Sequence, residues 1–279
     1  METVAVVGVG LIGASFGLAL RRAGFSGRII GVSSPRAIKA GLDIGAISDE
    51  MSLENAAEIA DLIYLAQPVE RILNTIELLG KSVNPNCLIT DAGSTKGSIV
   101  KRALDHLPRN SFLGGHPMAG KEQRGANAAD GTLFSGRPYV LTPSGELTDK
   151  MSQLQSWLRR IEARVVVMSP AEHDNVVALT SHLPQLLSTA ISITLAQQNN
   201  ARLREVFGPG LLDMTRLAMS SPDLWQSILD TNRHEIIKAL NELTENVKVL
   251  HDCVQSGKTV DDLFATARTF ALDLRKKKN

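Results

Sequence analysis

The feature that most constrains the fold is the N-terminal sequence METVAVVGVGLIG, in which a short β-branched run leads directly into Gly8, Gly10 and Gly13. A G-x-G-x-x-G pattern between a strand and a helix is the fingerprint of a dinucleotide-binding βαβ unit. The first glycine permits a tight turn, the second lets the backbone approach a pyrophosphate, and the third lets helix and strand pack closely. A glycine-rich turn that binds no ligand is the alternative, but the strand–helix context favours the dinucleotide site.

The first 168 residues alternate short apolar runs with stretches of helical character. We predict strands over residues 4–9, 28–33, 62–66, 87–91, 111–115, 138–142 and 164–168. Their near-continuous apolar composition is typical of strands that helices cover on both faces. Helices are predicted between them, for example over 11–24 and 146–163. This alternation predicts an α/β fold with a doubly wound, mostly parallel sheet.

After residue 168 the strand signals stop and long stretches with helical periodicity follow. We predict helices over 176–198, 232–255 and 260–276, with a kink at Pro184. Several are too apolar to be stable alone in water, so they must pack on one another or on a second subunit. The sequence therefore predicts two domains, 1–168 for dinucleotide binding and 169–279 as a helical domain.

The end of the second predicted strand, GVSSPRAIKAG, indicates which dinucleotide is bound. Ser33 stands where an acidic residue would bind the ribose 2′-hydroxyl of NAD, and Ser34 and Arg36 follow. Hydroxyls and a guanidinium can hydrogen-bond to a 2′-phosphate, which an acid would repel, so the sequence favours NADP. Capping of a helix at Pro35 is a compatible second role for these residues. The other candidate cofactor-binding residues are Leu11, Ile12, Gln67, Pro68 and Asp91.

Two polar stretches follow predicted strands, where open α/β sheets bind their ligands. TDAGSTKGSIV carries Ser94, and GGHPMAGKEQRG carries His116 between a Gly-Gly pair and a proline. Ser94 has the alternative role of a helix N-cap, and a lone histidine near a strand end is usually structural. Glycine and proline around His116 let the backbone approach a ligand and fix the loop, which favours a catalytic role for this histidine.

The helical half contains a further polar group. Ser181, His182 and Gln185 lie within one helical turn among apolar residues, where polar side chains are costly unless they are paired. In GPGLLDMTRLAMSSPDLW, Arg216 is either a surface residue whose stem covers apolar surface or a clamp for a substrate carboxylate.

Composition narrows the classes of partner and the compartment. The chain is 43% hydrophobic and 21% charged with a formal net charge of +1, which argues against nucleic acid as a partner. Two cysteines form no disulfide framework or metal-ligand spacing and are typical of a reducing compartment. The N-terminus has no signal-peptide pattern, and no membrane-spanning segment is expected. We therefore expect a cytoplasmic protein that binds no metal.

Together the motifs G-G-H-P-M-A-G-K-E, D-x-G-S-x-K, S-H-L-P and D-M-T-R, following the N-terminal glycines, resemble the prephenate/arogenate dehydrogenases of tyrosine biosynthesis. The resemblance extends from the first strand to about Asn232. It implies a dinucleotide-binding domain followed by a helical domain that forms a homodimer. It also implies that His116 is the catalytic histidine, Ser94 its hydroxyl partner and Arg216 a ligand of substrate carboxylate. The positions implied to line the substrate pocket are Glu122, Ser181 and His182.

One departure from the family bears on the substrate. Some members that use prephenate have S-H-L-P-H, whereas this chain has Gln185 in place of the second histidine. An amide can accept a hydrogen bond from an ammonium group, which a cationic histidine cannot do. We therefore expect the substrate to be arogenate, which carries an amino group where prephenate has a keto group, and we include Gln185 among the substrate-binding residues.

Two other classes of protein share the N-terminal fingerprint. Hydroxyacid dehydrogenases of this two-domain build use a lysine on the long helix after the cofactor domain, and here that helix has none. A non-catalytic NADP-sensing module would keep the glycines but would not need His116, Ser94 and Arg216 together. The sequence favours the dehydrogenase of tyrosine biosynthesis over both.

Overall fold

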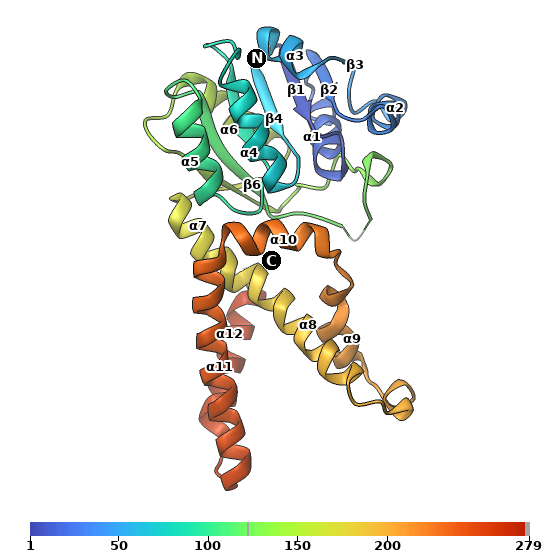
Figure 1. The fold of residues 1–279 in the computed structure, drawn as a ribbon, viewed down its shortest axis with the longest axis vertical. Helices are drawn as coiled ribbons and strands as arrows, with labels where there is room; N and C mark the ends of the chain where they lie inside the picture. The colour runs from blue at the N-terminus through green and yellow to red at the C-terminus, as the bar shows by residue number, and fades with distance from the viewer. Residues whose placement is uncertain (122, 277–279) are drawn as a thin grey trace. The chain divides into compact units, whose positions relative to one another are not determined.

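The computed structural model describes residues 1–121 and 123–276, which form two compact units. The first unit extends from Met1 to Arg233 and contains the whole sheet together with the helices that follow it (Figure 1). The second unit begins at His234 and consists of helices.

The first unit is built on an eight-stranded sheet with the order β3-β2-β1-β4-β5-β6-β7-β8. Its strands are β1 (Thr3–Val7), β2 (Arg28–Val32), β3 (Asp49–Glu50), β4 (Leu62–Leu65), β5 (Leu88–Asp91), β6 (Phe112–Pro117), β7 (Pro138–Thr142) and β8 (Arg164–Val167). All neighbours pair in parallel except β6 and β7, which are antiparallel. Every strand expected from the sequence is present, and the mostly parallel α/β sheet is confirmed. The short β3 was not expected, because two polar residues carry no strand periodicity.

Strand β1 is the point at which the strand order reverses. Val4 pairs with Ile29 of β2 on one side and with Leu62 of β4 on the other, so successive connections run to opposite sides of β1. In doubly wound sheets this reversal opens a crevice beyond the carboxyl ends of the strands, where ligands bind.

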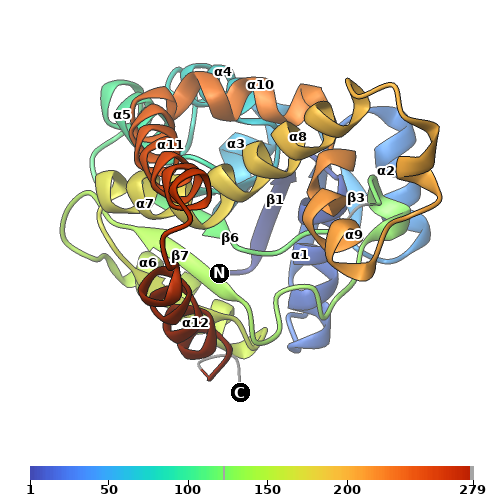
Figure 2. The ribbon, with the colours of Figure 1, turned by 90° about the horizontal axis from the view of Figure 1, so that it is seen from below.

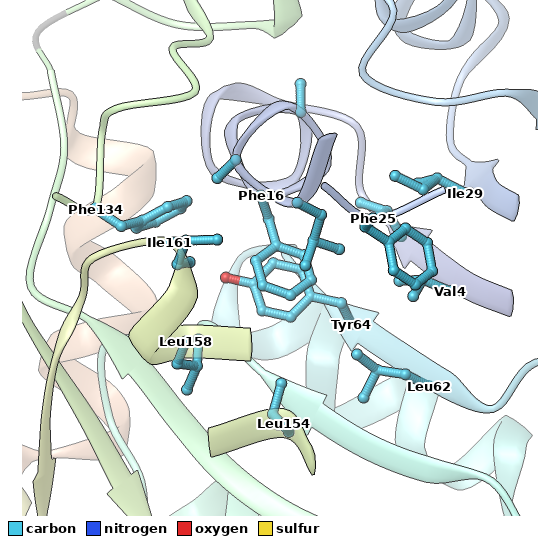
Figure 3. Packing of buried hydrophobic residues seen from close by; sticks show 14 of the residues in the cluster. Val4, Phe16, Phe25, Ile29, Leu62, Tyr64, Phe134, Leu154, Leu158 and Ile161 are labelled. Atoms are coloured by element: carbon cyan, nitrogen blue, oxygen red, sulfur yellow. The ribbon is translucent and has the colours of Figure 1, made fainter. Parts of the chain in front are cut away.

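Helices cover both faces of the sheet. They are α1 (Leu11–Arg22), α2 (Pro35–Asp43), α3 (Leu53–Ile59), α4 (Val69–Leu79), α5 (Gly97–His106) and α6 (Asp149–Arg160). Alternate side chains of β4 enter opposite cores, because successive residues of a strand point to opposite faces. Tyr64 stacks on Phe16 of α1 with ring centroids 4.0 Å apart, beside Leu158 of α6 (Figure 3). On the other face Ile63 packs in the cluster that contains Ile72 of α4.

The glycines of the fingerprint are required by packing as well as by any ligand. Gly8 has φ of 97°, a left-handed conformation that favours glycine. A Cβ on Gly13 would lie 2.2 Å from the carbonyl oxygen of Gly8, so α1 can approach β1 only without a side chain there. A Cβ on Gly10 would meet nothing within 4 Å, which leaves that backbone open to a ligand.

Beyond residue 168 the described elements are helical. Helix α7 (Pro170–Val177) continues through a π-helical turn (Ala178–His182) into α8 (Leu183–Ala196), and α9 (Pro209–Thr215) and α10 (Pro222–Thr231) follow. The expected break at Pro184 takes the form of this widened turn, since proline provides no N–H for the regular hydrogen-bond ladder. Figures 1 and 2 show that α7, α8 and α10 lie beyond one end of the sheet.

The helix expected over 176–198 begins earlier than its apolar pattern indicates. Pro170 is in the first turn of α7, and the side chain of Ser169 accepts the backbone N–H of Glu172 at 3.1 Å. Serine at the N-cap, proline in the first turn and an acid two residues later form a helix-start signal. The residues SPAEHD are therefore part of a helix.

The second unit presents much apolar surface. Its helices are α11 (Arg233–Ser256), whose first residue ends the first unit, and α12 (Asp261–Lys276), close to their expected bounds. Its most exposed large apolar side chains include Val254, Phe264 and Phe270. In the first unit, one helical run of the described residues, Pro170–Ala196, is long and apolar enough to cross a membrane. This criterion uses length and composition only, and core helices of soluble proteins meet it too.

Candidate active site

A cleft of about 430 Å³ lies at the carboxyl ends of β1, β4, β5 and β6. Four loops that follow these strands supply most of its lining, and α10 supplies the rest. The structure brings together six of the residues expected from the sequence in this cleft: Leu11, Ile12, Gln67, Pro68, Ser94 and His116. From α10 the cleft is lined by Asp223, Ser227 and Ile228.

A second hollow adjoins the glycine-rich turn and has the chemistry of a dinucleotide site. Gly8, Gly10, Ser33 and Ser34 line it, together with Arg71 of α4. Helix α1 begins here with Gly10 at its N-cap and no side-chain capping bond, so its first backbone N–H groups are directed at the hollow. The residues present therefore fit the pyrophosphate and ribose of a dinucleotide.

The residues that follow β2 have two roles: they begin helix α2, and they line this hollow. Ser34 is the N-cap of α2, and Pro35 is in the first turn, as the capping alternative expected. The Ser34 side chain nevertheless makes no capping hydrogen bond. Arg36 is exposed and is not among the lining residues, whereas Arg71, which the sequence did not single out, is.

His116 is at the carboxyl end of β6, where the residue is 9% exposed and lines the cleft. Its Nδ1 lies 2.8 Å from Nε2 of His173 in α7, and the two rings meet edge to face. Burial lowers the pKa of His116 well below its ordinary value of 6.5, and the neighbouring His173, Lys96 and His182 lower it further. The ring is therefore neutral at physiological pH and able to accept a proton.

The two glycines before the histidine have a different role from the one expected. A Cβ on Gly114 would lie 2.2 Å from Oγ1 of Thr142, and one on Gly115 would lie 2.5 Å from the carbonyl oxygen of Asp91. These glycines therefore allow close packing within the protein. Gly120 lines the cleft, and its Cβ would meet nothing within 4 Å, so it is the glycine that leaves room for a ligand.

Asp91 also has a structural role. Its carboxylate is completely buried and pairs with the ammonium group of Lys96. It also accepts the backbone N–H groups of Gly93 at 2.8 Å and Gly115 at 3.0 Å. With no exposed surface, this carboxylate acts as structural support for the start of the site, and its contact with a cofactor stays a prediction.

Ser94 is half-buried in the cleft wall and is not a helix cap. Helix α5 begins at Gly97, and its N-cap is Lys96. The start of α5 is instead supported by Asp174 of α7, which accepts the backbone N–H groups of Lys96 at 2.7 Å and Gly97 at 2.8 Å. The capping alternative for Ser94 is therefore wrong.

His182 belongs to the same polar network as His116. The side-chain nitrogen of Asn232 donates to the carbonyl oxygen of Asp174 at 2.8 Å and lies 3.3 Å from Nδ1 of His182. The His182 ring packs edge-on against Trp225. Burial lowers the pKa of His182 to about 4, so this ring is also neutral.

Four expected substrate contacts do not reach the cleft wall. Arg216 is exposed and Ser181 is half-buried, and neither is among the lining residues. His182 and Gln185 are buried in the helical part, and Nε2 of Gln185 donates to the carbonyl oxygen of Leu217 at 2.9 Å. Glu122 lies outside the described residues.

Two functional candidates, His173 and Asp174, were missed from the sequence. Both lie in α7, just after the helix-start signal at Ser169, and that signal would have placed them on a helix. Among the residues that the structure describes, there is no cluster of three or more His, Cys, Asp or Glu side chains that could hold a metal ion.

Comparison with known proteins gives a consistent result along the chain. Residues 16–167 match the family model "Prephenate dehydrogenase, nucleotide-binding domain", and residues 169–269 match "Prephenate dehydrogenase, dimerization domain". The chain is 35% identical to the prephenate dehydrogenase of Bacillus subtilis, over 99% of this chain and 77% of that protein.

Two solved structures at 28% identity are similar over nearly the whole fold. One is prephenate dehydrogenase from A. aeolicus in complex with hydroxyphenyl propionate and NAD⁺, with a TM-score of 0.91 and 98% of each chain covered. The other is Synechocystis arogenate dehydrogenase, with a TM-score of 0.83 and 99% of each chain covered. A nucleotide-binding domain followed by a helical dimerisation domain, as the resemblance implies, is thereby confirmed.

Proposed function

This chain belongs to the prephenate dehydrogenase family, and we propose that it is the NADP-dependent dehydrogenase that converts L-arogenate to tyrosine by oxidative decarboxylation. The observation that carries the proposal is the position of His116, a buried neutral base in the wall of a cleft that continues into a dinucleotide site.

The substrate is a cyclohexadienol with a ring hydroxyl at one end and a quaternary carbon bearing a carboxylate at the other. NADP⁺ held at the hollow lined by Gly8, Gly10 and Ser33 would supply the hydride acceptor for the carbon that carries this hydroxyl. His116 accepts the hydroxyl proton, and Ser94 bridges the histidine and the hydroxyl. The bond to the carboxylate then breaks with loss of carbon dioxide, its electron pair makes the ring aromatic, and the ring oxygen takes the proton back from His116 to give the phenol. The protein therefore supplies mainly orientation and proton transfer.

Binding of NADP is supported by the residues of the second hollow. Ser33 occupies the position at which an acid would select NAD, and Ser34 beside it adds another hydroxyl. The guanidinium groups of Arg36, exposed on α2, and Arg71, in the wall of the hollow, are available to attract a 2′-phosphate.

Arogenate is proposed from the chemistry of Gln185, which is buried in the helical part and does not line the cleft. The carbonyl oxygen of Leu217 can only accept a hydrogen bond, so the Gln185 amide must present its nitrogen there. Its side-chain oxygen is then the atom left to accept a hydrogen bond, which suits an ammonium group. Prephenate is the second candidate substrate, since the B. subtilis and A. aeolicus relatives are named for it.

We also propose that the protein acts as a cytoplasmic homodimer. Residues 169–269 match a dimerisation domain, and exposed apolar side chains of α11 and α12 would be covered by a second copy. We retain residue 168 as the boundary between a cofactor domain and a substrate and dimerisation domain. Arg216, Ser181, His182 and Glu122 are proposed to complete the substrate pocket.

The experiment that tests this function is a spectrophotometric assay of the purified protein with arogenate and NADP, with the product identified by chromatography. We expect formation of reduced nicotinamide with equimolar tyrosine. Turnover of a simple 2-hydroxy acid in place of arogenate and prephenate would indicate a hydroxyacid dehydrogenase. Binding of NADP without turnover of any of these compounds would indicate a sensing module.

A further inference from the structure

We propose that His173 and Asp174 are positioning residues for His116, which fix Nε2 as its basic nitrogen and offset the charge that it gains. The inference rests on the proposed dehydrogenase function, in which His116 accepts the substrate proton. It concerns two residues of α7 that are not exposed to the cleft and act only through His116.

The three side chains form a continuous hydrogen-bonded chain. Oδ1 of Asp174 lies 2.8 Å from Nδ1 of His173, and Nε2 of His173 lies 2.8 Å from Nδ1 of His116. His173 is completely buried, and Asp174 and His116 are 7% and 9% exposed. Because the chain is shielded from water, its hydrogen bonds are stronger than the same bonds at a surface.

The order of donors in the chain follows from the chemistry of its ends. An ionised carboxylate can only accept, so Asp174 requires a hydrogen on Nδ1 of His173. We place the other hydrogen-bonding position of His173, its Nε2, as the acceptor of the Nδ1–H of His116. His116 is left with its lone pair on Nε2, the nitrogen that remains available to the cleft. Two histidines that only pack together would not need this fixed order of donor and acceptor nitrogens.

Asp174 is held firmly enough to define that polarity. Besides His173, it accepts the backbone N–H groups of Lys96 and Gly97, and its own carbonyl oxygen accepts from Asn232. A Cβ on Gly97 would lie 2.9 Å from Oδ2 of Asp174, so the glycine leaves the carboxylate the space it occupies. Charge-assisted bonds of this kind stabilise the ionised carboxylate.

Among the described residues, the other charged and titratable groups that act on the pKa of His116 disfavour its charged form. Lys96 is a buried cation paired with Asp91, and His182 is neutral at physiological pH. A positive charge on buried His116 would therefore be costly without Asp174. After proton transfer from the substrate, the Nδ1–H of His116 still donates to His173, and the Asp174 carboxylate at the end of the chain offsets the new charge.

Three variants separate positioning from simple packing. His173→Phe fills a similar space but removes the acceptor, and we expect kcat to fall about 10²-fold or more, with KM nearly unchanged. The acidic limb of the pH profile of kcat/KM should also move to lower pH, because protonated His116 loses its support. His173→Gln keeps an amide oxygen that can accept from His116 and an amide N–H that can donate to Asp174, so it should restore much of kcat.

Tyr139→Phe is the matched control, because Tyr139 is a buried side chain in β7, the neighbour of β6, and its hydroxyl bonds to that of Tyr64 at 3.2 Å. It should lower stability without moving the pH profile. Equal kcat and the same acidic limb in His173→Phe and Tyr139→Phe would show that His173 has a packing role only.

Nitrogen-15 NMR of the imidazoles in the ligand-free wild type tests the tautomer without depending on activity. We expect His116 to be protonated at Nδ1 and unprotonated at Nε2. Protonation at Nε2 would overturn the inference while leaving the dehydrogenase function in place. Absence of turnover with the expected tautomer intact would instead refute the proposed function.

Discussion

Asp174 accepts the backbone N–H of Lys96 at 2.7 Å and thereby joins α7 to the loop that carries Ser94. The two residues lie on opposite sides of residue 168, where the sequence changes from strands to helices. His116 is attached to the same helix through His173. The candidate site is thus assembled from the sheet and from the helices after it, and one carboxylate helps to set the geometry between them.

Replacement of His116 by asparagine tests the general base. Because asparagine cannot accept a proton at this position, kcat should fall by roughly 10²–10⁴ while folding and NADP binding remain near wild type. Steady-state kinetics with calorimetric NADP binding measures both. His106→Asn, a half-exposed histidine at the end of α5, is the control and should behave as wild type. A fully active His116→Asn enzyme would show that this histidine is structural.

The pH dependence of stability follows from the buried histidines. Burial lowers the pKa of His182 to about 4 and that of His116 well below 6.5, so the folded state favours neutral rings. The unfolded chain binds protons once the pH falls below about 6.5, so folding loses stability from there toward about pH 4. Urea unfolding at about pH 7 and about pH 5 should give a lower free energy of unfolding at the lower pH. His182→Gln should reduce the difference between the free energies of unfolding at the two pH values. An unchanged difference would show that His182 is not responsible for the loss of stability at low pH.

Cofactor choice is tested at the end of β2. Wild-type kcat/KM should be far higher with NADP than with NAD, and Ser33→Asp combined with Arg36→Ala should narrow or reverse that preference, since an acid repels the 2′-phosphate. Arg71→Ala should raise KM for NADP more than KM for NAD. Equal or better wild-type kcat/KM with NAD would refute the NADP proposal.

The two kinds of glycine around His116 should respond differently to substitution. Gly115→Ala places a methyl group 2.5 Å from a backbone oxygen, and we expect a loss of about 1–3 kcal/mol or a failure to fold. Gly120→Ala meets nothing within 4 Å, so stability should be retained. Denaturant unfolding of the two variants provides the comparison, and equal stabilities would be inconsistent with the packing described.

Local motifs were sufficient to predict much of this arrangement. The glycine pattern correctly placed α1 directly after β1. Ser94, after β5, and His116, at the carboxyl end of β6, lie in one cleft, as expected. These inferences succeeded because parallel strands bring their carboxyl ends to the same edge of the sheet. Residues that follow different strands therefore lie near one another even when they are far apart in the sequence.

The rest depended on tertiary contacts that no local pattern records. The bond between His116 and His173 joins residues that are 57 positions apart, and nothing in either segment specifies the partner. The amide of Gln185 turns toward Leu217 because the 3₁₀ segment after α9 packs there, which helical periodicity cannot express. The role of Gly115 likewise depends on the neighbouring strand β5.

Substrate choice by the helical part is tested with Arg216 and Gln185. Arogenate and prephenate share both carboxylates, so Arg216→Ala should impair the two substrates by a similar factor, mainly through KM. Gln185→His should raise the use of prephenate relative to arogenate. If Arg216→Ala changed the ratio of kcat/KM for arogenate to kcat/KM for prephenate, Arg216 would instead contact the substrate side chain, in which the two compounds differ.

The most direct test is the ratio of kcat/KM for arogenate to kcat/KM for prephenate, measured with NADP on the wild-type enzyme. A polar site built for one group rejects an analogue that leaves its buried atoms unpaired. We therefore predict a strong preference for arogenate, with tyrosine as the product. Turnover of prephenate at an equal or higher kcat/KM would contradict the assignment of arogenate as the substrate.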